Sequence, residues 1–237
     1  AIGATRRRPR APRNTAFMAR KQLALIIQSI IALLIVEGVG VLAATRLAYP
    51  ASGFDVRVSG VSPFQFLLGF VVGTALLILI IRTVKARLAF EAIFALAIFA
   101  GIWFLFSTVV PRTAPFLAAA VVALRYVAPL VLIQNLIMIA GVAGIATSLG
   151  AGTSWPSLAL VLAILAVYDV VAVYGTHHMV TMFKGLLARG VILALVIPEH
   201  PRLLFKNLHT VSPGEGFFFL GTGDVALPTI FVVSALR

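Results

Sequence analysis

Two aspartates inside long apolar segments are the residues of this chain best placed to do chemistry. Asp224 lies in 217–236, FFFLGTGDVALPTIFVVSAL, and Asp169 lies in LVLAILAVYDVVAVYG. A carboxylate at membrane depth is costly, so such residues usually have a function. Two carboxyl groups about 3 Å apart share one proton, because both cannot ionise easily. One can then deprotonate a water while the other donates to a carbonyl oxygen under attack. We therefore expect the two aspartates to meet and to hydrolyse a peptide bond without a metal, cofactor or covalent intermediate.

The composition places these aspartates in a multi-spanning membrane protein. Of 237 residues, 61% are hydrophobic and only 11% are charged, whereas soluble domains average about 25% charged residues. The net charge of +12 does not indicate a nucleic-acid partner, because seven of the 19 basic residues lie in the first 21 and most others lie between apolar runs. That distribution is typical of the positive-inside rule. The chain has no cysteine, so thiol chemistry is excluded.

The apolar runs predict an all-α, polytopic transmembrane bundle of about seven spans. Residues 1–21 are expected to form a basic cytoplasmic tail, and 22–237 the membrane domain. Within that domain 177–216 is expected to be a cytoplasmic loop. Its short apolar piece 191–198 cannot span a bilayer, and it is a candidate lid or substrate-access element. Phe217–Phe219 is expected to be an interfacial, lipid-facing anchor. The predicted spans are 22–44, 64–81, 89–110, 116–128, 130–149, 156–176 and 217–236.

The basic residues also predict the orientation. With the N-terminus inside, 15 Lys and Arg fall in cytoplasmic segments and only four fall outside, namely Arg46, Arg57, Arg112 and Arg237. At 1.5 Å per residue, Asp169 is then about 12 Å, and Asp224 about 10 Å, from the cytoplasmic ends of their spans. Because these two spans run in opposite directions, the aspartates are expected at nearly the same depth.

The residues around Asp224 fit a reactive site. Gly221 and Gly223 loosen the chain just before it and leave the backbone open to close approach. Pro228 has no N–H to donate to the carbonyl four residues earlier. A loosened helical turn beside an acid gives an extended peptide access to it.

The Tyr-Asp of LAVYDVVAVYGTHHMVTM and the Gly-x-Gly-Asp of FLGTGDVALP resemble the two active-site motifs of the presenilin and signal-peptide-peptidase family of intramembrane aspartyl proteases. The run VYGTHHM is especially similar to microbial, notably archaeal, members. The resemblance covers roughly 130–236. It implies that Asp169 and Asp224 are the catalytic pair, with Tyr168, Gly221, Thr222 and Gly223 supporting the motifs and substrate binding.

The resemblance further implies nine spans and cleavage of transmembrane substrates or signal-peptide remnants in the bilayer of a prokaryotic plasma membrane. No metal, cofactor or nucleic acid is expected. The family also has a Pro-Ala-Leu motif in its ninth span, and Ala226-Leu227-Pro228 is not that motif. We therefore expect this chain to be a fragment that lacks the last two spans and is inactive or incompletely folded by itself. The sequence gives no indication of oligomeric state.

Other polar residues are given structural roles. Glu37, deep in the first span, is expected to be hydrogen-bonded within the protein. Gln134 and Asn135 are expected to bond a neighbouring helix. His177 and His178 are adjacent, so they point to different sides of a helix and make a poor metal site.

Two other functions stay open at the level of sequence. Prepilin and preflagellin peptidases also use a Gly-x-Gly-Asp aspartate, although their partner acid lies at a loop or helix end. A transporter or ion-leak protein could use two acids on a glycine-broken helix as a proton or cation site. We find no internal repeat between the two halves of the chain that would favour transport.

Overall fold

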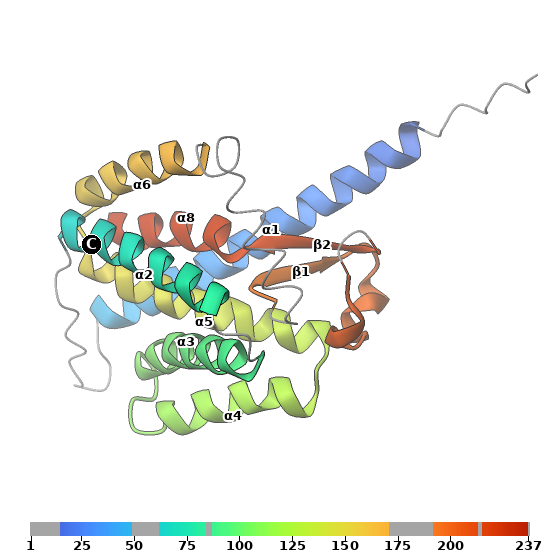
Figure 1. The fold of residues 1–237 in the computed structure, drawn as a ribbon, viewed down its shortest axis with the longest axis horizontal. Coiled ribbons are helices and arrows are strands. Elements are labelled where there is room, and N and C mark those ends of the chain that lie inside the picture. Colours follow the sequence, from blue (N-terminus) through green and yellow to red (C-terminus); the bar gives the residue numbers. More distant parts are fainter. Residues whose placement is uncertain (1–14, 49–61, 84–86, 171–191, 213–214, 237) are drawn as a thin grey trace, which may run out of the picture.

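The protein is a bundle of helices with one small sheet at one end (Figure 1). The computed structural model describes residues 15–48, 62–83, 87–170, 192–212 and 215–236. Seven α-helices are found in these residues, as the apolar runs predict: α1 (Thr15–Ala48), α2 (Pro63–Thr83), α3 (Arg87–Ser107), α4 (Ala114–Val127), α5 (Val131–Gly152), α6 (Trp155–Val170) and α8 (Thr222–Ala235). The predicted helical fold class is confirmed.

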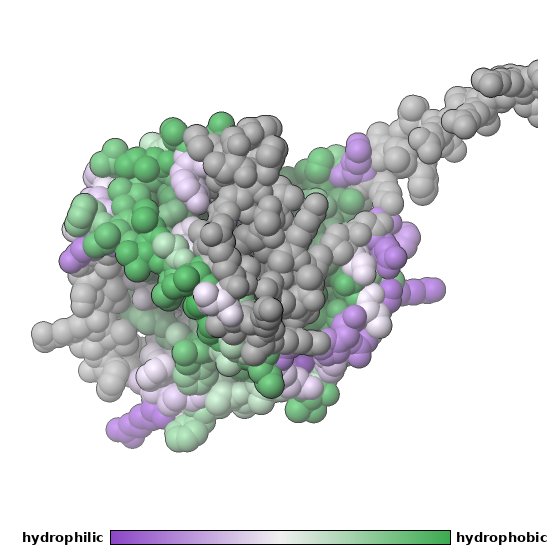
Figure 2. Space-filling view, in the orientation of Figure 1, coloured by the Kyte–Doolittle hydropathy of each residue, from purple (hydrophilic) through white to green (hydrophobic). Residues whose placement is uncertain are grey.

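Several helices expose apolar side chains, as lipid-facing helices do. Among the residues that the structure describes, three segments are long and apolar enough to cross a membrane: Gln22–Leu47, Leu88–Ser107 and Val131–Gly152. Hydrophobic colour covers much of the visible helical surface, whereas hydrophilic side chains gather at the end that carries the strand pair (Figure 2). This distribution fits a bilayer as the solvent for the helical part.

The break between α4 and α5 has a local cause. Helix α4 ends at Val127, and Ala128 takes φ −130° and ψ 81° before Pro129. The proline ring disfavours the helical conformation of the residue before it. The boundary predicted between 128 and 130 is therefore correct to within a few residues.

The centre of the bundle is α5, which packs against α1, α3, α4 and α8. Its contact with α3 is made by backbone, because a β-carbon on Gly144 would clash with the carbonyl oxygen of Gly101. A β-carbon on Gly101 would in turn clash with the carbonyl oxygen of Gly141. Small residues of this kind allow membrane helices to approach closely. Helices α3 and α5 therefore form a closely fitted pair on one side of the core.

The prediction of one continuous span over 217–236 is wrong. Residues Phe217–Gly221 form strand β2, which pairs antiparallel with β1 (Ala194–Pro198), and α8 begins only at Thr222. Phe217 is buried and Phe218 is 46% exposed, which is the alternation of a strand. The expected lipid-facing anchor at Phe217–Phe219 is therefore wrong for Phe217. Apolar length alone could not separate a strand followed by a helix from one long helix.

The same correction applies to 191–198 and to the depth of Asp224. Most of the short apolar piece is strand β1, with every residue of the strand buried, and its role as a lid or substrate-access element stays a prediction. Asp224 lies in the first turn of α8, not two turns into a span. The segment between the strands contains two short 3-10 helices, η2 (Pro201–Phe205) and η3 (Leu208–Thr210).

The α3–α5 contact yields a stability prediction. Gly144→Ala should destabilise the protein by about 1–3 kcal/mol, because the added methyl group forces the two backbones apart. The measurement is thermal unfolding of the detergent-solubilised protein. Gly73→Ala on α2 is the matched control, since its β-carbon meets nothing within 4 Å and alanine favours helix. Equal losses in the two variants would contradict the close-packing argument.

Candidate active site

Asp224 lies at a junction where a strand passes directly into a helix. Gly221 is both the last residue of β2 and the N-cap of α8, with φ −60° and ψ 140°. Asp224 follows three residues later, in the first helical turn, and is exposed. A carboxylate there is stabilised by the helix N-terminus. A β-carbon on Gly221 would lie 3.0 Å from Asp224 Oδ2, so the glycine leaves room for the carboxylate.

The other glycine of the motif borders open space. A β-carbon on Gly223 would meet nothing within 4 Å, and Gly223 is exposed. Pro228 lies inside α8 and has no N–H to donate to the Asp224 carbonyl. The chain on both sides of Asp224 therefore has the bare backbone and weakened first turn that the sequence predicts.

Asp169 lies in the last described turn of α6, and its side chain is outside the described part of the structure. Its neighbour Tyr168 is 38% exposed and packs edge-to-face on Phe70 of α2, with ring centroids 5.6 Å apart. This contact attaches the end of α6 that carries Asp169 to α2.

Helices α6 and α8 pack side by side and run in opposite directions (Figure 1). Three buried residues of α6, namely Leu158, Val161 and Leu165, form one hydrophobic cluster with Ile230 of α8. Leu227 and Phe231 of α8 also pack against this cluster. The predicted antiparallel neighbourhood of the two acid-bearing helices is therefore observed.

Helical periodicity predicts that both acids lie near this interface. Position 169 follows Leu165 by four residues and Val161 by eight, so it continues their stripe on α6. Asp224 precedes Leu227 by three residues and Phe231 by seven, so it continues the corresponding stripe on α8. The separation of the two carboxyl groups stays a prediction.

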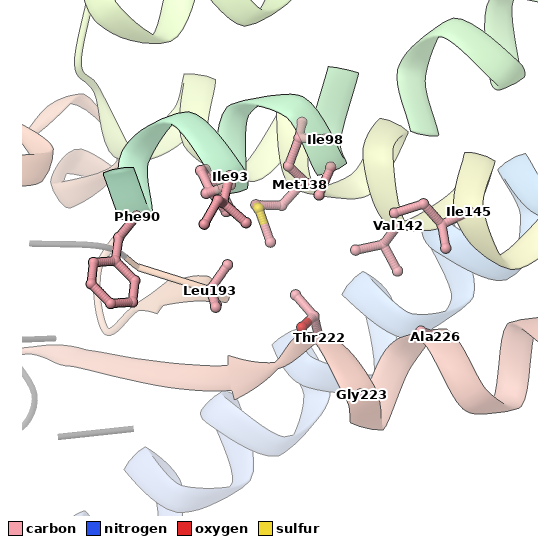
Figure 3. Close-up of a pocket in the computed structure, with 12 residues that line it drawn as sticks. Phe90, Ile93, Ile98, Met138, Val142, Ile145, Leu193, Thr222, Gly223 and Ala226 are labelled. Carbon is pink, nitrogen blue, oxygen red and sulfur yellow. The ribbon is translucent and has the colours of Figure 1, made fainter. Parts of the chain in front are cut away.

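The start of α8 also borders an apolar cavity of about 350 Å³ (Figure 3). Thr222, Gly223 and Ala226 form its α8 wall. Side chains of α3 and α5 form the remainder, together with Leu193, and they include Phe90, Ile93, Met138 and Val142. An apolar group therefore fits directly beside the backbone that precedes Asp224.

The amides at the start of α5 have a role that sequence reasoning missed. Gln134 accepts from Arg125 Nε of α4 at 2.6 Å, which agrees with the expected bond to a neighbouring helix. It also donates to the carbonyl of Ile192 at 3.0 Å. Asn135 bonds the backbone of Val196 in β1 and not a helix. No local sequence signal identifies these bonds, because the strand that they hold forms only by pairing with residues 217–221.

The remaining candidates contribute little to the site. Glu37 is half-buried in α1, and its predicted hydrogen-bonded role stays a prediction. His177 and His178 lie outside the described residues. Within the described part of the chain, no group of three His, Cys, Asp or Glu residues could hold a metal ion.

Comparison with known proteins connects this geometry to a family. The family described as "Signal-peptide peptidase, presenilin aspartyl protease" matches residues 23–236. A search of curated proteins gave no match. Two solved structures of a presenilin family intramembrane aspartate protease, in C222 and P2 crystal forms, each have a TM-score of 0.58 to this chain. They are 21% and 22% identical to it, and the alignments cover 89% and 86% of this chain and 76% and 74% of theirs.

At these identities the structural likeness shows a shared fold. The family match covers nearly the whole chain, and its members are membrane-embedded proteases. This integral membrane protein therefore belongs to the signal-peptide-peptidase and presenilin family of aspartyl proteases.

Proposed function

We propose that the protein is an intramembrane aspartyl endopeptidase that cleaves peptide bonds within transmembrane segments or signal-peptide remnants. The observation that carries the proposal is the antiparallel packing of α6 and α8, whose contact stripes extend by helical spacing toward position 169 and Asp224. Two acids on facing stripes can share one water and one peptide carbonyl. The family match supports the same activity.

In the proposed mechanism each aspartate has a separate task. The ionised carboxylate takes a proton from water as the water oxygen bonds to the peptide carbonyl carbon. The protonated carboxyl donates to the carbonyl oxygen, which gives a neutral diol at that carbon. The C–N bond then breaks while a proton moves to the departing amine, and the shared proton returns to the pair. One water is consumed, because its OH group stays in the new carboxyl group and its other proton is transferred to the amine.

Residues near the two aspartates leave space for the substrate and support the helices that carry the acids. Gly221 and Gly223 keep side chains away from the backbone before Asp224, so an extended peptide can approach closely. Thr222 and Gly223 also border the apolar cavity, which suits an apolar side chain of a membrane-derived substrate. Tyr168 supports the end of α6 through its contact with Phe70.

We place the protein in the plasma membrane of a prokaryote with its N-terminus in the cytoplasm. The support is the distribution of 15 basic residues on one predicted side and four on the other. Transmembrane segments and the lipid bilayer are the partners of this site.

The aspartates give the central prediction. In the full-length protein, Asp169→Asn or Asp224→Asn should each lower the cleavage rate of a transmembrane substrate at least about 10³-fold, because an amide cannot exchange the required proton. The double variant should be hardly worse than either single variant. The measurement is product formation from a labelled transmembrane substrate in proteoliposomes.

The control for this experiment is Glu37→Gln, an equally conservative change of a half-buried acid on α1, which should retain substantial activity. An Asp224→Asn protein that cleaves near the unmodified rate would end the protease proposal. Uptake of protons or cations by the same proteoliposomes would then favour transport.

The two glycines before Asp224 should respond differently to one added methyl group. Gly221→Ala should lower kcat about tenfold or more, because its β-carbon lies 3.0 Å from Oδ2 and displaces the carboxylate. Gly223→Ala should change the position of the carboxylate little, since its β-carbon meets nothing within 4 Å. Initial rates and KM for the two variants, measured side by side, test this difference. Equal kcat values would show that Gly221 does not set the position of Asp224.

Cysteine labelling tests the orientation. In this chain without native cysteine, Ser52→Cys and Asn207→Cys should react with a membrane-impermeant maleimide from opposite sides of sealed vesicles. Ser52 is expected outside and Asn207 in the cytoplasm. Reaction of both from the same side would contradict the predicted topology.

A further inference from the structure

The side chain of Asn135 forms the same pair of backbone hydrogen bonds with strand β1 that a neighbouring strand would form. Asn135 Nδ2 donates to the carbonyl of Val196 at 2.7 Å, and Asn135 Oδ1 accepts from the Val196 N–H at 2.8 Å. A carboxamide has one donor and one acceptor side by side. In an antiparallel sheet a residue presents its N–H and C=O to the same edge, so this single side chain satisfies one residue of that edge.

Strand β1 is therefore held from both sides. Val196 lies opposite Phe219 in the register with β2, and Ala194 lies opposite Gly221. Because Val196 directs its N–H and C=O to Asn135, the ladder bonds to β2 come from the residues that flank it. Asn135 thus fixes the edge of β1 that faces away from β2.

A second anchor lies four residues earlier in the same segment. Gln134 is fully buried and donates to the carbonyl of Ile192 while it accepts from Arg125. The Arg125 guanidinium also lies over the ring of Phe94, 4.7 Å from its centroid. Two successive residues of α5 therefore hold 192–196 in one register.

Strand β2 connects β1 directly to the helical turn that carries Asp224. Gly221 ends β2 and caps α8, so no loop separates the sheet from the helical turn that carries the acid. At the other end of this path, α5 is held against α3 by the glycine contacts at Gly141 and Gly144. A displacement of β1 relative to α5 must therefore move the start of α8.

We propose that Asn135 is a positioning residue of the active site, which aligns the Asp224 carboxylate by holding strand β1 to α5. The inference rests on the proposed protease function and adds a residue of α5 whose side-chain hydrogen bonds go to strand β1. It predicts that catalysis responds to the hydrogen-bonding state of side chain 135 even while the fold is retained.

Asn135→Asp separates positioning from mere stability, because its side chain changes hydrogen-bonding state with pH. The protonated acid donates to Val196 O and accepts from Val196 N, as the amide does, whereas the carboxylate can only accept. Charged residues on the elements packed against α5 include Arg125 on α4, Glu91 and Arg87 on α3, Arg202 on η2, Lys206 directly after η2, Glu37 on α1 and Asp224 on α8. These charged residues and the two aspartates are the same in the variant and in the unmodified protein. The pH dependence that they cause therefore cancels in the ratio of the two kcat values.

The experiment measures kcat and KM of the full-length protein from pH 5 to pH 8.5 with a labelled transmembrane peptide in detergent micelles. For Asn135→Asp, the kcat ratio should be within about threefold of one at pH 5 and about tenfold lower at pH 8.5, with KM changed less than about twofold. Asn207→Asp is the matched control, since Asn207 only accepts from the His209 N–H. Its ratio should stay flat, because a carboxylate also accepts.

Thermal unfolding at both pH values shows whether the fold is retained. If Asn135→Asp unfolds at pH 8.5, the comparison is made with Asn135→Ser, whose hydroxyl cannot span both backbone groups and which should lower kcat about fivefold at every pH. A kcat ratio near one throughout, or a loss that is equal at all pH values and follows unfolding, overturns the positioning role. Asp224→Asn, assayed in parallel, distinguishes failure of the positioning role from failure of the proposed protease function. Full activity of Asp224→Asn would contradict the protease function itself.

Discussion

Helix α5 approaches its neighbours so closely that at several positions no β-carbon fits between the chains. Gly144 faces the backbone of α3 at Gly101, Gly141 faces Ile98 of α3, and a β-carbon on Gly150 would lie 2.6 Å from the carbonyl oxygen of Ile230 in α8. Lipid provides no hydrophobic force that pushes membrane helices together, so close van der Waals contact must do so. The α5 glycines thereby determine where both α3 and α8 lie, and α8 carries Asp224.

The two ends of α5 serve the site in different ways. Its glycine-rich part positions α3 and α8 through close backbone packing. Its first turns carry Gln134 and Asn135, which hold the segment of strand β1 by hydrogen bonds. A strand pair beside a bilayer is costly unless its edge groups are satisfied. The amide of Asn135 meets that requirement at Val196, and a strand can therefore lead directly into the helix that bears the acid.

Much of this arrangement was predictable from local sequence signals. Long apolar runs gave the helices, Pro129 marked the break between α4 and α5, and the isolated acids with the Gly-x-Gly pattern marked the candidate site. The strand pair was not predictable in the same way, because Phe217–Gly221 is as apolar as the helix that follows it. Its strand state depends on pairing with β1, a partner about 20 residues earlier. The bonds of Asn135 are equally non-local, since they join residues 61 positions apart.

The junction between β2 and α8 suits the proposed action of this site on an extended peptide. A peptide bond inside an α-helix has its carbonyl engaged in the helical ladder and its faces covered by side chains. A protease in a membrane must therefore receive its substrate unwound and must deliver water to it. The start of a helix is suited to both tasks, because its first N–H groups have no intrahelical partner and can bind a polar chain or water. By ending β2 at Gly221 and beginning α8 at Thr222, the chain places Asp224 at such a start and keeps bare backbone beside it. A continuous span over 217–236 would have placed the same acid inside a closed helical ladder, where neither water nor an extended peptide could reach it as readily.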